Sequence, residues 1–237
     1  MARAAAAPNA PRGAQESWLR RLIGDINWTL LSIAIVAALL FVALTVLVAV
    51  HPAPFFFDRP IAVAVQTFNV GWFGWFNSFV SDFSGFVGLG VGAAVIVLTF
   101  LLRRPATPLV AFSAIYAVVY NVVNIIIRRP RPTGLAHTTS KLIGYSYPSG
   151  HVGFFFWLSV LALALLARKL PRPLYIACWF LAAVLVAASA LSRIYVGAHW
   201  PSDVVGGLLV GVAWTCLSFS LGRLTKPVFA PERSTAR

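Results

Sequence analysis

An almost unbroken run of apolar residues, 26–50, constrains the fold of this chain more than any other feature of its sequence. A helix over these positions would be roughly 37 Å long, because each residue adds about 1.5 Å. That length is sufficient to cross the hydrocarbon core of a bilayer, which is about 30 Å thick. The run is longer than the apolar region of a signal peptide, and no small-residue cleavage site follows it. We therefore predict a transmembrane helix over residues 26–50.

Five further apolar segments follow, and most of them are separated by short basic or proline-containing turns. They cover residues 84–102, 108–127, 151–167, 174–191 and 203–221. The chain has 237 residues, of which 59% are hydrophobic and only 11% are charged, and its mean hydropathy is +0.84. Such values exclude an ordinary soluble domain. We predict an all-α polytopic membrane protein whose six transmembrane helices form one domain, residues 26–221.

Three segments lie outside these helices. Residues 1–25 are rich in Ala, Pro and Arg and end in a basic amphipathic stretch, so we expect a cytoplasmic tail that is disordered and then amphipathic. Residues 51–80 combine prolines with an aromatic cluster, which suits a segment at the level of the lipid headgroups. Residues 222–237 are polar, and we predict a second cytoplasmic tail there.

The basic residues indicate how the chain is oriented. Six spans place both termini on one side, and 13 of the 19 Lys and Arg residues fall on that side. The positive-inside rule then puts the termini in the cytoplasm. Five of the six remaining basic residues lie in two outer segments, 128–141 and 192–203, where an anionic substrate would explain them. A nucleic-acid partner is not indicated, because the charges gather at the ends of apolar segments and no nucleic-acid motif is present.

The outer segment 192–203 holds ionisable residues that are costly at the edge of a bilayer. Pro201 suits the first turn of the next helix, which puts Asp203 about one turn from His199. A carboxylate in that position can accept a hydrogen bond from one imidazole nitrogen and leave the other free for nucleophilic attack. Arg193 can bind phosphate oxygens through its planar guanidinium. The alternative is a helix-end cluster that only anchors the loop to lipid headgroups.

Two other outer segments have matching chemistry. Arginines at 128, 129 and 131 could bind phosphate, although contact with lipid headgroups would also explain them. Ser149 and Gly150 stand at the predicted start of a helix, where backbone N–H groups and the helix dipole favour anions. His151 beside them could act as a general acid, because its ordinary pKa is near neutrality. The alternatives are a helix cap for Ser149 and an interfacial side chain without chemistry for His151.

Taken together, these segments resemble the three-part signature of the type 2 phosphatidic acid phosphatase (PAP2) superfamily, which includes glucose-6-phosphatase and the vanadium haloperoxidases. The resemblance spans residues 124–203, and the six-helix layout is similar to that of the membrane branch of the family. The residues that carry it are Arg131-Pro132, Pro148-Ser149-Gly150-His151, Ser192-Arg193, His199 and Asp203.

The resemblance implies a role for each matching residue. His199 would be the nucleophile and form a phosphohistidine, and Asp203 would orient and polarise it. His151 would protonate the leaving group. No metal would be needed, which agrees with the six acidic residues forming no carboxylate cluster for Mg²⁺, so we expect no cofactor. The phosphoryl oxygens would be held by Arg131, Arg193, Ser149 and the backbone N–H of Gly150.

The sequence departs from the family pattern at the start of the first motif. The family has a Lys seven residues before the Arg-Pro pair, and this chain has Asn124 there. An amide can still donate a hydrogen bond but carries no charge. Arg128 lies one helical turn after Asn124, so we hypothesise that it supplies the missing charge.

We therefore predict a metal-independent membrane lipid phosphatase that acts on phosphatidate, phosphatidylglycerol phosphate or undecaprenyl diphosphate. Its partners would be the lipid phosphate and the bilayer, with the termini in the cytoplasm and the site facing outside, in a bacterial plasma membrane. The oligomeric state is not indicated. Two alternatives stay open. One is a lipid phosphotransferase that uses the same residues, and the other is a non-catalytic lipid-binding or transport relative, for which Asn124 is the main argument.

Overall fold

The computed structural model describes residues 25–67, 71–82, 86–138, 144–167 and 169–229, and these contain helices and no strand. The predicted tails therefore lie largely outside the described residues. The helices are α2 (Trp28–Val50), α3 (Asp58–Gln66), α4 (Gly71–Asp82), α5 (Phe86–Leu102), the 3₁₀ helix η1 (Arg104–Ala106), α6 (Thr107–Ala114), α7 (Tyr116–Ile127), α8 (Gly150–Leu166), α9 (Arg172–Tyr195), α10 (Pro201–Ser220) and α11 (Gly222–Phe229).

The all-helical prediction is confirmed for the described residues. Four stretches are long and apolar enough to cross a membrane: Trp28–Val50, Arg104–Ile127, Arg172–Tyr195 and Pro201–Ser220. Two shorter apolar helices, Val87–Leu102 and Gly150–Leu166, fall on the other two predicted spans. Large apolar side chains face outward along these helices, such as Leu39 at 65% and Phe180 at 73% exposed. Exposure of this kind is suited to lipid rather than to water.

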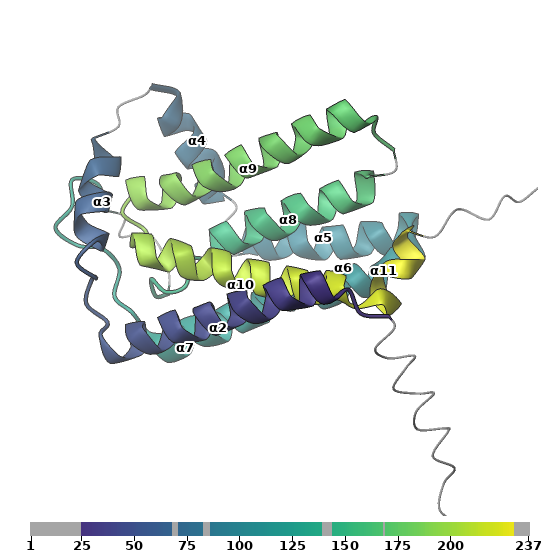
Figure 1. The fold of residues 1–237 in the computed structure, drawn as a ribbon. Helices are drawn as coiled ribbons and strands as arrows, with labels where there is room; N and C mark the ends of the chain where they lie inside the picture. The colour runs from purple at the N-terminus through teal and green to yellow at the C-terminus, as the bar shows by residue number, and fades with distance from the viewer. Residues whose placement is uncertain (1–24, 68–70, 83–85, 139–143, 168, 230–237) are drawn as a thin grey trace, which may run out of the picture.

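Helix α10 occupies the centre of the bundle, with α2 and α7 on one side and α8 on another (Figure 1). Glycines on α10 permit this close packing. A Cβ atom on Gly207 would lie 2.1 Å from the carbonyl oxygen of Ser149, and one on Gly211 would lie 3.2 Å from the Cα of Gly153. The backbone at the start of α8 can therefore approach α10 only because these positions carry no side chain.

One end of the bundle joins the two ends of the described chain (Figure 1). Asn27 N donates to Ser220 O at 2.8 Å, and Gly222 N donates to Asp25 O at 2.7 Å. Helix α11 packs at this end, where Arg103 donates to Val228 O at 2.8 Å. Residues 222–229 of the predicted tail are therefore helical, and Val228 among them is buried.

The opposite end differs from the sequence prediction in a way that matters for the site. Residues 51–80, predicted only as a headgroup-level segment, fold into α3 and α4, and both pack against the end of α9. The predicted helix 108–127 is also divided, into α6 and α7, at Ile115. A buried carboxylate explains the position of α3: Asp58, its first residue, pairs with Arg129 at 2.9 Å and accepts a hydrogen bond from Ser202 N at 2.9 Å.

Candidate active site

The structure brings the three sequence motifs together at the end of the bundle where α7 and α9 end and α8 and α10 begin. The rings of His151 and His199 have centroids 6.5 Å apart. Arg131 Nη1 donates to Ala198 O at 2.8 Å, which ties the first motif to the loop that carries His199. Residues that are far apart in the sequence therefore form one polar cluster beside the two histidines.

His199 lies in the loop between α9 and α10 and is 4% exposed. Its Nδ1 atom is 2.6 Å from the carbonyl oxygen of Ser146. A carbonyl oxygen can only accept, so Nδ1 carries the proton and Nε2 presents its lone pair. Burial lowers the pKa of His199 well below its ordinary value, and the neighbouring Arg131 and His151 lower it further. The imidazole is therefore neutral near pH 7, with the nitrogen suited to nucleophilic attack.

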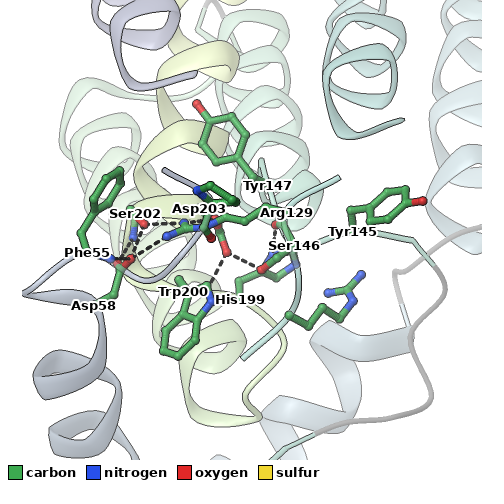
Figure 2. A network of polar contacts seen from close by, with 12 residues as sticks. Phe55, Asp58, Arg129, Tyr145, Ser146, Tyr147, His199, Trp200, Ser202 and Asp203 are labelled. Atoms are coloured by element: carbon green, nitrogen blue, oxygen red, sulfur yellow. Dashed lines mark hydrogen bonds and ion pairs between the residues drawn. The ribbon is translucent and has the colours of Figure 1, made fainter. Parts of the chain in front are cut away.

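Asp203 does not contact His199 in the way the sequence predicted. Its Oδ2 accepts from Trp200 N at 2.7 Å and from Ser146 Oγ, and its Oδ1 accepts from Arg129 Nη1 at 2.6 Å. Ser146 consequently joins the two, because its hydroxyl bonds Asp203 while its carbonyl holds His199 (Figure 2). Among the described residues, the carboxylate of Asp203 is therefore joined to the imidazole of His199 through Ser146, and not by a direct hydrogen bond.

A buried ionic network adjoins this arrangement (Figure 2). The guanidinium of Arg129 is fully buried and pairs with Asp203 at 2.6 Å and with Asp58 at 2.9 Å. Ser202 bonds both sides, since its hydroxyl lies 2.7 Å from Arg129 Nη1 and 2.7 Å from Asp58 Oδ2. The remaining donors of Arg129 meet the backbone of residues 52 and 53. Arg129, which the sequence grouped with the phosphate-binding arginines, therefore has a structural role.

Sequence reasoning missed Asp58 and Ser146. Asp58 stands in an aromatic segment of a chain that has only six acidic residues, and this rarity was the signal that could have identified it. Ser146 was not detectable, because it acts through both its backbone and its hydroxyl on residues more than 50 positions away.

Several polar atoms beside the histidines are buried and have no hydrogen-bond partner among the described residues. Arg193 uses Nη2 to bond Asn77 O, Ser81 Oγ and Ser192 Oγ at 2.9–3.2 Å, which leaves its Nε and Nη1 without partners. Ser149 Oγ and His151 Nε2 are also unpartnered. Unsatisfied buried donors are rare and costly in folded proteins, so a cluster of them indicates the place of a polar ligand. A guanidinium, a hydroxyl and an imidazole together suit an oxyanion.

The start of α8 is consistent with an anion as well. Ser149 is the N-cap residue of this helix, yet its side chain makes no capping bond. Its backbone N–H is occupied, since it donates to Asp203 O at 2.9 Å. Gly150 is the first helical residue, and a Cβ atom there would lie 2.7 Å from the Tyr120 ring. The side-chain hydroxyl of Ser149 and the helix N-terminus thus remain available to an anion.

Two predicted phosphate ligands make other bonds in the structure. Asn124 Nδ2 donates to the carbonyls of Tyr145 and Tyr147, both at 2.9 Å, and its Oδ1 accepts from Tyr145 N. This side chain therefore holds the loop before α8. Arg128 is exposed at the C-terminal end of α7, with φ 54°, and its Nε donates to Ile125 O at 3.0 Å. The structure does not support the hypothesis that Arg128 replaces the missing ammonium.

Comparison with known proteins agrees with this geometry. The sequence model of the PAP2 superfamily matches residues 105–225, which is half of the chain and includes all three motifs. The chain belongs to the PAP2 superfamily. Helices α3 and α4, with Asp58 and Asn77, lie outside the matched region.

Individual proteins that match this chain have low sequence identity to it. An undecaprenyl-diphosphatase of Sulfolobus acidocaldarius is 32% identical over 113 residues, which are 46% of this chain and 51% of that protein. The chain thus matches about half the length of this curated relative. Two solved structures share the fold at 20% identity. The transmembrane PAP2 type phosphatidylglycerolphosphate phosphatase of Bacillus subtilis has a TM-score of 0.64 and covers 79% of this chain and 94% of its own. LpxE of Aquifex aeolicus has a TM-score of 0.52 and covers 70% and 96%.

Proposed function

We propose that this PAP2 protein is an integral-membrane phosphatase that hydrolyses a phosphomonoester or diphosphate of a lipid through a phosphohistidine. The observation that carries this proposal is the cluster of unpartnered buried groups on Arg193, Ser149 and His151, close to a neutral His199. Such a cluster suits the binding of a phosphoryl group beside the nucleophile. Family membership and the name of the Sulfolobus relative support the reaction class.

The mechanism follows from the atoms that are available. Nε2 of His199 attacks phosphorus, the bond to the leaving oxygen breaks, and His151 gives that oxygen its proton. Arg193, Arg131 and Ser149 stabilise the charge on the remaining oxygens, which is the main requirement of phosphoryl transfer. The carbonyl of Ser146 holds the Nδ1 proton of the phosphohistidine. Water then attacks phosphorus, His151 takes a proton from it, and inorganic phosphate leaves as His199 is restored.

The proposed topology has six spans, with both termini in the cytoplasm and the site at the outer face of a bacterial plasma membrane. The site residues lie at the end of the bundle opposite α11 and Asp25 (Figure 1), which supports this orientation. The candidate substrates remain phosphatidate, phosphatidylglycerol phosphate and undecaprenyl diphosphate. The names of the Sulfolobus and Bacillus proteins favour the last two.

The deciding experiment measures release of inorganic phosphate by the detergent-purified protein in the presence of EDTA. Each of the three lipids is tested with the wild type and with His199→Ala. We expect release that survives EDTA and is lost in the variant. Release abolished by EDTA would contradict the metal-independent mechanism, and release that persists in His199→Ala would contradict the nucleophile.

Repeating the assay with a ³²P-labelled lipid distinguishes the phosphatase from the two alternative functions. A phosphotransferase would label a second lipid from a ³²P-labelled donor and release little phosphate. A non-catalytic relative would bind the lipid but neither release nor transfer phosphate. The main argument for a non-catalytic relative was Asn124. That argument is weaker because the side chain of Asn124 holds the loop before α8.

A further inference from the structure

Helix α4 lies outside the region matched by the family, yet two of its polar residues, Asn77 and Ser81, contact Arg193. Its described buried side chains, Phe73, Asn77 and Val80, are 7%, 6% and 0% exposed. Spacings of four and three residues place all three on the same face of the helix. Phe73 packs edge-on against Tyr195 at the end of α9, at 5.1 Å between centroids. Asn77 is thus a buried amide in the middle of an otherwise apolar face.

The amide of Asn77 has no hydrogen-bond partner among the described residues, at either Nδ2 or Oδ1. The other described amide side chains differ from it. Gln66 and Asn124 donate to and accept from backbone groups of neighbouring loops. Asn121 donates to Ala117 O of its own helix. A buried amide without any partner is unfavourable by itself, so it indicates that a ligand completes its bonding.

Two contacts place Asn77 beside the catalytic groups. Its own carbonyl accepts from Arg193 Nη2 at 3.2 Å, and Ser81, one turn later, accepts from the same nitrogen at 2.9 Å. The guanidinium of Arg193 is therefore held against α4. The unpartnered Nε and Nη1 atoms belong to the same planar guanidinium. A ligand that bonds these two atoms would therefore lie close to α4.

Helices α4 and α8 contribute side chains to one buried cluster. Val80 shares a buried cluster with Phe154 and Phe155 of α8. Val80 follows Asn77 by three residues, and the two phenylalanines follow His151 by three and four, so each polar residue lies one turn from this cluster. The amide atoms of Asn77 and the Nε2 atom of His151 are buried and have no partner among the described residues, at the end of the bundle where Nε and Nη1 of Arg193 are also unpartnered.

We propose that Asn77 is a further substrate-binding residue, whose amide bonds the phosphoryl group alongside Arg193. An amide offers a donor and an acceptor, so Nδ2 can donate to a charged phosphoryl oxygen while Oδ1 accepts from a protonated one. This assignment rests on the proposed phosphatase function. It would give the site a neutral ligand from α4, whereas Asn124, at the position of the family Lys, is committed to the loop before α8.

The test compares Asn77→Ala with Asn121→Ala, a control in which the lost amide is exposed and bonds only its own helix. Three quantities are measured: kcat/KM for the best lipid, inhibition by orthovanadate as a phosphoryl analogue, and Tm. For Asn77→Ala we expect kcat/KM to fall about tenfold or more, and the inhibition constant of vanadate to rise in parallel, because a hydrogen bond to a charged group is lost. The control should match the wild type in all three.

Tm separates binding from structure. Asn77→Ala removes buried polar atoms that have no partner, so its Tm should not fall. Asn77→Asp, which keeps the size of the side chain, should lose more activity and vanadate affinity than the alanine variant, because a carboxylate repels the phosphoryl oxygens.

Two outcomes would overturn the assignment. One is unchanged kcat/KM and vanadate inhibition in Asn77→Ala, and the other is lost activity with lower Tm but unchanged vanadate inhibition. His199→Ala is assayed in parallel. If that variant stays active, the proposed function fails, whereas an inactive His199→Ala beside a fully active Asn77→Ala overturns only the role of Asn77.

Discussion

Side chains around His199 divide into those whose hydrogen bonds are complete and those whose bonds are not. Arg129 and Asp203 have every charged group matched within the protein, and their network is joined to the imidazole through Ser146. Arg193 and His151 retain buried atoms with no partner. Complete bonding is typical of positioning residues, and incomplete bonding is typical of groups that meet a ligand. This distinction separates Arg129 from Arg193, although both are fully buried arginines.

Arg129 provides a direct test of the buried network. Arg129→Ala should destabilise the protein by about 3–5 kcal/mol, because it leaves two buried carboxylates without their cation. The measurement is thermal or denaturant unfolding in detergent. Arg128→Ala is the matched control, since that side chain is exposed and bonds only Ile125 O, and it should unfold like the wild type. Equal stability of the two variants would contradict the structural role of Arg129.

The lowered pKa of His199 predicts how stability depends on pH. In the unfolded chain an imidazole takes up a proton near pH ~6.5, whereas burial keeps His199 neutral in the folded protein. The unfolded state thus binds more protons below that pH, so stability is lost as pH falls below about 6.5. Tm should drop more steeply between pH 7 and pH 5 in the wild type than in His199→Gln. Parallel curves for the two proteins would show that the folded imidazole titrates normally.

Between helices, the decisive contact is the approach of α8 to α10. The carbonyl of Ser149 meets the backbone of Gly207, and Ser149 N bonds Asp203 O at 2.9 Å. These contacts hold the motif at the start of α8 against the motif at the start of α10. Helices α3 and α4 complete the site from a third side, where α3 supplies Asp58 and α4 supports Arg193. Relative helix position therefore determines which side chains meet.

Gly207→Ala should lower both stability and activity, because the added Cβ would lie 2.1 Å from Ser149 O and would force α8 from α10. We expect a loss of at least about 1–3 kcal/mol from overpacking. Gly92→Ala on α5 is the control, since nothing lies within 4 Å of its added Cβ, and it should be neutral or slightly stabilising. Unfolding in detergent and phosphate release measure the two effects, and a neutral Gly207→Ala would contradict this packing.

The molecule as a whole has two unlike ends and an apolar outer surface. At one end the start of α2 meets α11 through Asp25 and Gly222. At the other end the motif residues gather with their buried ion pairs. Exposed leucines and phenylalanines cover the sides of the long helices between them. A bundle of this kind suits a bilayer, and we expect its candidate site to lie at one membrane surface.

The proposed orientation can be tested with single cysteines introduced into a variant in which Cys178 and Cys216 are replaced by alanine. A cysteine at Thr133, exposed in the loop after α7, should react with a membrane-impermeant thiol reagent in intact cells. A cysteine at Lys169, exposed in the turn between α8 and α9, should react only after the cells are permeabilised. The reverse pattern would place the site on the cytoplasmic side.

The apolar helices and the family could be predicted from the sequence, because both depend on residues that are close together along the chain. Apolar runs predicted the four helical stretches that are long enough to cross a bilayer and the two shorter apolar helices, because hydrophobicity and length are properties of consecutive residues. The three motifs together, with His151, Arg193 and His199 among their residues, likewise identified the family, which the sequence model confirmed. The division of residues 51–80 into α3 and α4 was missed, because proline and aromatic residues there gave no clear helical period.

The tertiary structure decided how those residues meet. Asp58, Arg129, Ser146 and Asp203 come from four separate segments, and only the packed helices bring them within hydrogen-bonding distance. Asn124 and Arg128 were expected at the phosphate, but the amide of Asn124 is committed to backbone carbonyls, and Arg128 is exposed with its Nε bonded to Ile125 O. The physical reason is that a hydrogen bond depends on distance and direction in space, whereas the sequence specifies only residue type and order. Local sequence thus determined the spans and the chemistry, and packing determined which groups are left for a ligand.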